Sequence, residues 1–397
     1  MLKTMESENI IKELSNKNNE PKWLLDRRLA AYNLFRQKPM PDFIYGLNIN
    51  LNIDINLDEI DGESSEEAER KIINSNKGII IQNFKEILEG NELLFKEKFM
   101  SNCVPAVDKF TAFHNAFVNN ILLVYVPKNT EVKETVEIIT NVSSQVFFDH
   151  LIIIVDDNSK LTLVEGINSK NDEKSYVSKI VEIFIGNNAK LDYGNLQQLN
   201  EKAFNFTIKR AITRRDSVMN WLDCCFGSRI ALSEVTTFLN EQGAATNNYG
   251  IFFGNESQQF DLVANSIHNA PNTVSDIFTK GALTGKAKCI YRGLVRIEKN
   301  AFGSNGYQKE DTLLLSPDAA ADSIPNLEIE NSTVRCTHGA SIGRIDREKM
   351  FYLKSRGLDE KEATSTYVKG FFEGLIQKMK IEKLRDNMHE LIEKRMS

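Results

Sequence analysis

The sequence contains no C-x-x-C motif, and its only five cysteines lie at positions 103, 224, 225, 289 and 336. An odd number of cysteines without a regular spacing is typical of free thiols in a reducing compartment. We therefore expect a cytoplasmic protein. Without C-x-x-C pairs, a self-contained zinc ribbon or ferredoxin-type cluster is not expected.

The absence of other sequence motifs excludes further classes of function. No G-x-x-x-x-G-K-[ST] loop occurs, so we expect no nucleotide to be bound by this chain. The longest apolar runs, 121–126 and 151–155, are far too short to cross a bilayer, and the polar start lacks the pattern of a signal peptide. A net charge of −6 gives no sign of nucleic-acid binding. The 397 residues, 41% hydrophobic and 26% charged, are ordinary for a globular protein of two or three domains.

The middle of the chain, from about residue 110 to 312, alternates apolar and polar residues with the period of a β-strand. Small residues that follow turn-forming residues recur at intervals of 30, 28, 27, 43 and 14, all near multiples of 14. They are Ser159, Ala189, Ser217, Ala244, Ala287 and Ala301. A strand-and-turn unit of constant length predicts a solenoid, with the small residues at stacked corners. An antiparallel sandwich would also show strands at such intervals.

Helical patterns flank this region. A stripe of apolar residues follows Pro21 and ends at Pro39 and Pro41, and a second pattern from 83 to 100 is interrupted by Gly90. Residues 48–76 are rich in Asn, Asp, Glu and Ser, so we expect loop or short edge structure there. Packing is the expected role of these helices.

The C-terminal residues predict three helices. The first lies between Asp346 as N-cap and Gly357, and the second begins at a capping box formed by Asp359 and Glu362. This second helix carries a wide apolar stripe that either packs on the body of the protein or docks a partner. The candidate docking residues in it are Tyr367, Val368, Phe371, Phe372 and Leu375. The last helix, 381–396, is mostly charged, and we expect it to face solvent.

Cys336 and His338 are the strongest candidate ligands. Two residues apart in a strand, they leave the same face, and a thiolate and an imidazole together suit iron, copper or zinc. They supply only two donors, so a metal would need further ligands from elsewhere or from a second chain. Packing without a metal is the alternative. Cys224 and Cys225 are adjacent and point to opposite faces of a strand, so we expect packing there too.

Three segments near the C-terminus carry a family resemblance. S-P-D-A-x-A-D-S-I-P-x-L-E-I from Ser316, C-T-H-G-A-S-I-G-x-I-D from Cys336, and F-Y-L-x-S-R-G from Phe351 resemble the closing segment of the SufB/SufD family. Those proteins are scaffold subunits of the Suf machine, which assembles iron–sulfur clusters. The resemblance is strongest over 312–375 and clear at 20–47. It implies a mainly β fold, a right-handed parallel β-helix flanked by N-terminal and C-terminal helical regions, here 1–110, 111–345 and 346–397.

The resemblance also implies a function. It predicts a scaffold rather than an enzyme, with Cys336 and His338 as the candidate ligands of a transient iron–sulfur cluster at a subunit interface. By motif match His338 corresponds to the interface ligand of SufD-type chains and Cys336 to the cysteine of SufB-type chains, so the resemblance leaves open which donor is used. The C-terminal helices would dock a SufC-type ABC ATPase, whose ATP-driven closure moves them. The second subunit would be a SufB-type paralogue, or a second copy if this chain is itself SufB-type. Its length and the C-T-H-G-A sequence favour the SufD type. A structural subunit that binds no metal, or a β-helix enzyme acting on polysaccharides, are the alternatives.

Overall fold

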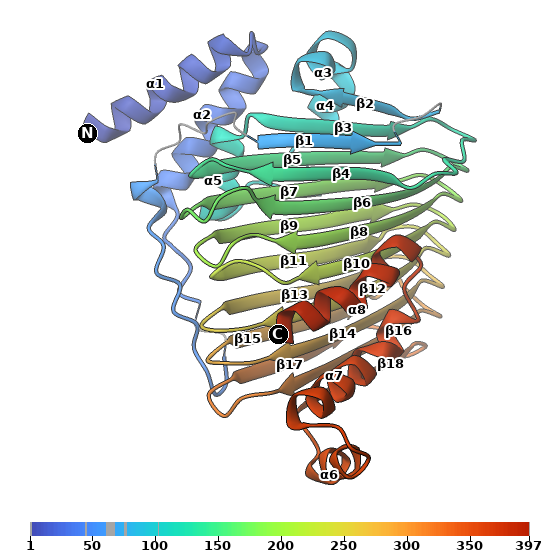
Figure 1. Cartoon of the computed structure of the whole chain (residues 1–397). Helices are drawn as coiled ribbons and strands as arrows, with labels where there is room; N and C mark the ends of the chain where they lie inside the picture. Colours follow the sequence, from blue (N-terminus) through green and yellow to red (C-terminus); the bar gives the residue numbers. More distant parts are fainter. Residues whose placement is uncertain (1, 44–45, 61–67, 75–77, 102, 397) are drawn as a thin grey trace.

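The computed structural model describes residues 2–43, 46–60, 68–74, 78–101 and 103–396. Its body is a β-solenoid of about eight turns, built from two nine-stranded sheets that face each other across the interior (Figure 1). The chain alternates between the two sheets, and successive strands of each sheet pair in parallel, except for antiparallel β1 and β2 at the start. The predicted mainly β fold with flanking helices is confirmed.

Sheet A contains the even-numbered strands from β4, with β1 at its edge. Its strands are β1 (Ala68–Ile73), β4 (Val136–Val142), β6 (Lys160–Ser169), β8 (Lys190–Gln198), β10 (Val218–Cys225), β12 (Ala245–Gly254), β14 (Val274–Leu283), β16 (Asn305–Leu314) and β18 (Arg335–Arg344). Sheet B contains β2 (Ile80–Asn83), β3 (Asn120–Val126), β5 (Val146–Val155), β7 (Tyr176–Ile185), β9 (Phe204–Thr213), β11 (Ile230–Leu239), β13 (Gln259–His268), β15 (Lys288–Ile297) and β17 (Ala320–Ile329).

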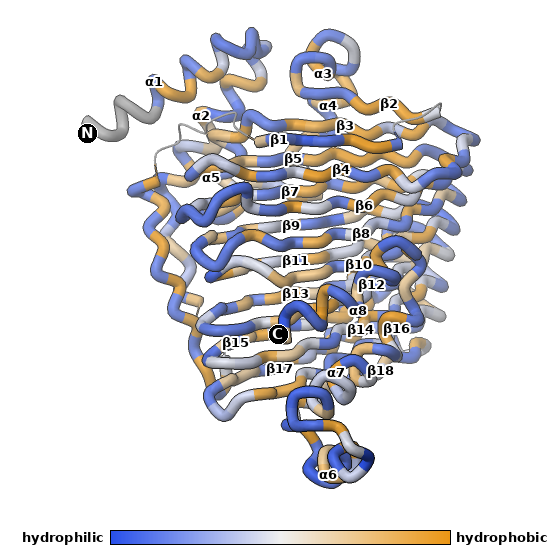
Figure 2. Tube along the Cα trace, in the orientation of Figure 1, coloured by the Kyte–Doolittle hydropathy of each residue, from blue (hydrophilic) through white to orange (hydrophobic). Residues whose placement is uncertain are grey.

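The predicted corners are present where the small residues lie. Asn158, Asn188 and Asp216 adopt positive φ angles of 58°, 54° and 54°, the left-handed region that Asn and Asp tolerate better than most residues. In each case the next residue is small and fully buried, because it stacks on the corner of the adjacent turn. Thr273 takes the same position after Asn272, which accounts for the wide predicted interval between Ala244 and Ala287. In Figure 2 the turns at the edges of the stack are mostly blue, and the strands carry the orange segments.

Helices cover one end of the stack and part of the outer face of each sheet. The N-terminal ones are α1 (Leu2–Lys17), α2 (Lys22–Gln37), α3 (Phe84–Gly90), α4 (Glu92–Lys98) and α5 (Lys109–Phe117), with a short 3₁₀ helix, η1 (Leu57–Glu59). α5 is buried along its whole length, and Phe110 stacks on Phe206 of β9 with ring centroids 4.5 Å apart. These helices therefore close the first turns of the solenoid and cover the outer face of the first sheet B strands. The predicted break at Gly90 separates α3 from α4.

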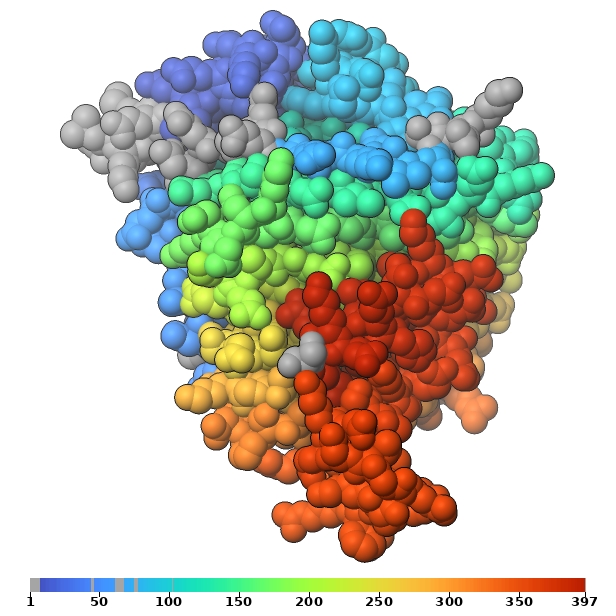
Figure 3. All heavy atoms as spheres, in the orientation of Figure 1, coloured from blue at the N-terminus to red at the C-terminus, as the bar shows by residue number. Residues whose placement is uncertain are grey.

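The C-terminal helices are α6 (Arg347–Ser355), α7 (Glu360–Ile376) and α8 (Glu382–Met396). Figure 3 shows α7 and α8, in red, lying over one face of the stack, while the segment of α6 projects beyond its last turn. The expectation that the last helix faces solvent was wrong for one side of it. Leu384, Met388 and Ile392 are buried against the outer face of sheet A, because a 3.6-residue period places them in one stripe.

An N-terminal strap, residues 46–60, runs along the outside of sheet B and reaches the last turn (Figure 1). At its tip the backbone N–H groups of Asn48 and Ile49 donate to Asp322 of β17, at 2.7 and 3.0 Å. Further along, Asn52 exchanges hydrogen bonds with Gln259 of β13, and polar contacts continue back to α5. The loop expected at 48–76 is thus an ordered connection at 48–60. Within that predicted range, β1 is an edge strand, and residues 61–67 and 75–76 lie outside the described residues.

Candidate functional site at the open end of the solenoid

The solenoid is closed by helices at its first turn and left open at its last. β18 pairs with β16 on one side and has no strand on its other side in the part of the chain that the structure describes. Nine of its ten residues are exposed, and only Cys336 is half-buried. An unpaired strand edge carries free backbone N–H and C=O groups, which are a template for pairing with another chain. The open end is therefore a surface suited to a protein partner.

Cys336 and His338 lie on the interior-facing side of β18. Their register partners on β16 are Gly306 and Gln308, and Cys336 packs on the interior apolar cluster of the last turns. A methyl group on Gly306 would lie 3.2 Å from Cys336 Sγ, so glycine leaves room for the thiol. Partial burial raises the pKa of the Cys336 thiol. The structure thus brings the two predicted ligands to one face, at the rim of the opening.

This pair has no third ligand close by. Among the residues that the structure describes, no group of three or more His, Cys, Asp or Glu side chains is arranged to hold a metal ion. The other four cysteines are buried. Packing was predicted for Cys224 and Cys225, and Cys224 faces the C-terminal helices while Cys225 faces the interior. No helix in the described part of the chain combines the length and apolar character needed to cross a bilayer.

A groove lies between α6 and α7, beyond the last turn. It has a volume of about 690 Å³ and is lined mainly by Tyr352 and Leu353 of α6 and by Tyr367, Gly370 and Phe371 of α7. α6 buries no residue of its own, and Phe351 and Tyr352 are 76% and 56% exposed. Two exposed aromatic side chains on a helix that packs mainly on α7 form a surface on which a partner can pack.

The structure divides the five predicted docking residues into two groups. Val368, Phe372 and Leu375 are fully buried between α7 and the outer face of sheet A, so this chain already occupies that side of the helix. Tyr367 and Phe371 are partly exposed and border the groove. Of the five predicted docking residues, only Tyr367 and Phe371 are accessible to a partner.

The comparisons with known proteins agree with this architecture. Residues 138–371 match the family model described as SUF system FeS cluster assembly, SufBD core domain, and residues 52–138 match the SufBD protein N-terminal region. The chain belongs to the SufBD family.

Two curated relatives cover nearly its whole length. An iron–sulfur cluster assembly SufBD family protein of Staphylococcus aureus strain USA300 is 30% identical over 419 residues, which cover 95% of this chain and 90% of the relative. A protein of the same description from Staphylococcus haemolyticus strain JCSC1435 is 31% identical over the same extent. The resemblance in the C-terminal motifs is thus confirmed at the level of the family.

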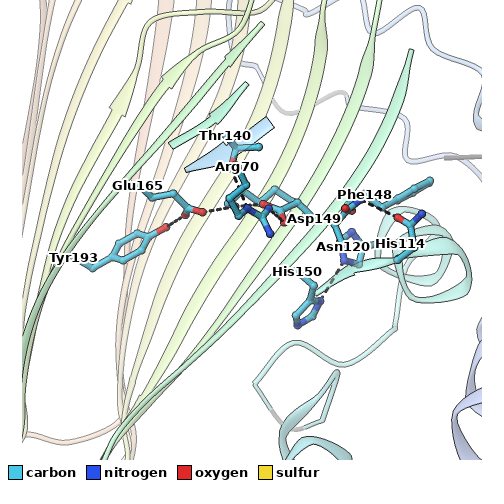
Figure 4. A network of polar contacts seen from close by, with 11 residues as sticks. Arg70, His114, Asn120, Thr140, Phe148, Asp149, His150, Glu165 and Tyr193 are labelled. Atoms are coloured by element: carbon cyan, nitrogen blue, oxygen red, sulfur yellow. Dashed lines mark hydrogen bonds and ion pairs between the residues drawn. The ribbon is translucent and has the colours of Figure 1, made fainter. Parts of the chain in front are cut away.

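Sequence reasoning missed a set of charged residues inside the solenoid of this SufBD-family chain. Lys179 of β7 contacts Asp149 of β5 and donates to Glu165 of β6 at 2.6 Å. The Tyr193 hydroxyl donates to the same glutamate at 2.5 Å (Figure 4). Arg70 of β1 also contacts Asp149. Burial opposes ionisation of Asp149, but Arg70 and Lys179 outweigh it and hold its pKa below the usual range.

A second buried set links the N-terminal cap to sheet B. His150 contacts His114 of α5, with ring nitrogens 3.2 Å apart, and Glu182 of β7 at 3.0 Å. Glu182 also accepts from the backbone N–H groups of Met100 and Val104. Burial, then the neighbouring His150, hold the pKa of His114 well below its usual value. Polar residues at inward positions of an apolar strand, such as Asp149 in V-F-F-D-H-L, were the available signal, but without the register they could not be paired.

Proposed function

We propose that this SufBD-family chain is a SufD-type scaffold subunit whose open end pairs with a SufB-type paralogue. One observation carries the proposal: the last strand, β18, is uncovered and carries a thiol and an imidazole on its inward side. A second solenoid placed end to end would cover both side chains and pair the free strand edge. Such an interface builds a ligand site at the place where the two chains meet.

In this proposal Cys336 and His338 supply ligands to an iron–sulfur cluster held transiently as cargo. Clusters and zinc sites commonly take four protein ligands, so two donors from one chain need two from the other. The contribution of this chain is to hold and orient, and no catalytic step is assigned to it. A β-helix enzyme acting on polysaccharides gains no support from the family match.

The groove between α6 and α7 is our proposed docking site for a SufC-type ABC ATPase, which would bind and hydrolyse the nucleotide. Tyr352, Tyr367 and Phe371 offer aromatic area at the groove, and aromatic side chains often dominate the free energy of protein association. α7 is tied to sheet A, because Lys280 of β14 donates to the carbonyl oxygen of Phe371 and Lys378 lies 3.6 Å from Asp276. Movement of a docked ATPase would therefore be passed to the stack through α7.

A SufB-type homodimer is the second candidate. It is favoured by the presence of both donor types in one chain, because two copies placed end to end would supply two thiols and two imidazoles. In that case no paralogue is needed for the cluster to form.

Anaerobic reconstitution with iron and sulfide, read by cluster absorbance, tests the proposal. The chain is measured alone and together with the ATPase and a SufB-type paralogue. We expect a cluster only with the paralogue, weakened at least several-fold by His338→Ala or Cys336→Ala. Thr337→Ala, on the same strand but facing outward, is the matched control and should leave the yield unchanged. A cluster on the chain alone that Cys336→Ala abolishes would favour the homodimer, and indifference to both changes would overturn the site.

Docking of the ATPase is tested separately by titrating it onto the full chain. Phe371→Ala and Tyr352→Ala should each weaken binding about 30-fold, the effect of losing about 2 kcal/mol at an aromatic hot spot. Phe302→Ala serves as control, because Phe302 is 54% exposed at a corner of the stack and lies outside the groove. Equal affinity of all three variants would remove the groove from the proposal.

A further inference from the structure

The interior of the solenoid next to the open end contains a cluster of buried side chains, several of whose polar atoms lack a hydrogen-bond partner among the described residues. Gln308 and Glu310 lie on the inward side of β16 and are 0% and 1% exposed, and Ser323 faces them from β17. Both polar atoms of the Gln308 amide, Oε2 of Glu310 and Oγ of Ser323 make no hydrogen bond in the structure. Thr312 donates to the other carboxylate oxygen of Glu310. Four buried polar atoms without partners on neighbouring inward positions are costly, since buried polar groups are normally hydrogen-bonded.

The charge of Glu310 is the main anomaly. Other carboxylates inside the solenoid have a cation beside them: Asp149 and Glu165 contact Lys179, and Asp223 lies 3.1 Å from Lys209. Glu310 makes no ion pair with any described residue. Burial raises its pKa to about 7, against the nearby hydroxyls of Thr312 and Ser323, which lower it. In the described part of the chain, only Thr312 makes a regular hydrogen bond to the carboxylate. The Glu310 carboxylate thus has no cationic side chain of a described residue beside it, and either a proton or a bound cation can compensate its charge.

These side chains lie one strand away from the exposed strand β18, next to the rim ligands. The register partner of Glu310 on the last strand is Ala340, and that of Gln308 is His338, both exposed. The only side chain of β18 that lies in register with the Glu310 carboxylate is thus the methyl group of Ala340. Gln308 reaches across toward sheet B, where Gly293 leaves the space that its amide occupies: a methyl group there would lie 1.9 Å from the amide nitrogen. The cluster of side chains therefore lies one strand away from Cys336 and His338.

We propose that Glu310, Gln308 and Ser323 form a receiving site for one ferrous ion, immediately inside the rim formed by Cys336 and His338. The proposal rests on the proposed role in cluster assembly, which makes iron a cargo of this chain. A carboxylate, an amide oxygen and a hydroxyl are hard donors that suit a hydrated divalent cation, with water filling the remaining positions. The softer thiol and imidazole at the rim suit the cluster, so the two donor sets would hold iron before and after it meets sulfide.

The test is anaerobic titration of the full chain with Fe²⁺ by calorimetry, repeated with Mn²⁺ by electron paramagnetic resonance. We expect one site per chain, weakened at least tenfold in Glu310→Gln, which keeps the shape and removes the charge. Asp311→Asn, the adjacent outward carboxylate paired with Lys309, is the matched control and should bind as the wild type does. The double variant Cys336→Ala/His338→Ala should also retain the site.

Two results would overturn the inference: no Fe²⁺ bound by the wild-type chain, or unchanged binding by Glu310→Gln. Circular dichroism and the thermal midpoint check that Glu310→Gln folds, which is expected because it removes an unpaired buried charge. The two proposals fail separately. If the rim variants assemble clusters normally while Glu310→Gln loses Fe²⁺, the rim assignment fails and the receiving site stands. If only the rim variants lose Fe²⁺, the receiving site fails.

Discussion

At the scale of single residues, the interior of this solenoid depends on charge pairing. Lys179 is fully buried and serves two carboxylates, Asp149 and Glu165. Burial lowers the pKa of Lys179, but its two acidic neighbours outweigh that effect and raise it. A buried ion pair contributes little net stability when intact, but removing one partner leaves an uncompensated charge in a medium of low polarity.

Lys179→Met should therefore destabilise the protein by about 3–5 kcal/mol, because two buried carboxylates keep only Arg70 as a cationic partner. Urea denaturation followed by circular dichroism measures the loss. Lys190→Met, at a partly exposed position of β8 where the lysine pairs with Asp192, is the control and should change stability by no more than about 1 kcal/mol. Equal effects of the two changes would show that the buried network contributes nothing specific.

His268 makes the stability of the protein depend on pH. Its two ring nitrogens contact the hydroxyls of Thr273 and Ser275 at 2.7 and 2.8 Å, and burial lowers its pKa to about 4. An unfolded chain protonates this histidine near pH 6.5, while the folded chain resists until about pH 4. Stability from this residue is complete above pH 6.5 and falls by about 1.4 kcal/mol per pH unit as the pH drops through that window.

We expect His268→Gln to be less stable than the wild type at pH 7.5 and to lose this disadvantage between pH 6.5 and 4. The difference between the two urea-unfolding curves, measured at half-unit intervals, isolates the residue from all other titrating groups. A difference that stays constant with pH would contradict the assignment.

At the scale of elements, most of the fold was predictable because its signals are local. Turn residues followed by small residues marked the corners, and Asp346 and Asp359 marked two helix starts, where each caps the first turn as predicted. Contacts between distant elements left no such signal. The burial of Leu384 on sheet A and the pairing of Asp149 with Lys179 depend on the register of separate turns, which spacing alone does not give.

The residues of the candidate site were likewise predictable only where their signal is local. Cys336 and His338 were identified from a local motif, and their common face follows from the period of a strand. Glu310 and Gln308 lie in the region that was predicted to form strands. Their spacing, however, does not distinguish an inward position on β16 from an outward one. Only the stacking of β16 between β14 and β18 shows which side is buried.

The N-terminal strap yields a prediction at this scale. Asp322 accepts from Asn48 and Ile49, and these hydrogen bonds outweigh burial and lower its pKa. Asp322→Ala should release the strap tip, because a charged acceptor is worth about 1.5–3 kcal/mol per hydrogen bond. Amide hydrogen exchange at residues 48 and 49 should then accelerate at least tenfold. Asp318→Ala, at an exposed corner nearby, should leave that exchange unchanged.

At the scale of the whole molecule, the two ends of the stack are unequal. The first turn is covered by helices whose aromatic residues are packed, while the last turn exposes almost all of β18. Stacked repeats bury apolar surface only against neighbours, so an uncapped final turn is a surface that a further repeat or another molecule can complete. This asymmetry is the reason that we place the partner at the last turn.

Ile342→Asp tests that placement. Ile342 is 40% exposed on the inward side of β18, and an aspartate there would bring an unpaired charge into an end-to-end interface. We expect it to weaken association with the paralogue, or with a second copy, at least tenfold in sedimentation experiments. Val274→Asp is the control, since Val274 is 47% exposed on the outer face of the stack, away from its end. Equal association of both variants would place the interface elsewhere.

The strap has a consequence for how the protein is made. Asn48 and Asp322 are 274 positions apart, so a ribosome that adds about 5–20 residues per second delivers the strap at least about 14 seconds before the strand that anchors its tip. The turns can stack one after another during that time, each on the one before it. The strap tip is secured only when β17 has joined the stack. A chain that ends before β17 therefore has an unanchored strap near its N-terminus as well as an incomplete last turn. Cellular quality control can recognise a truncated chain by either feature.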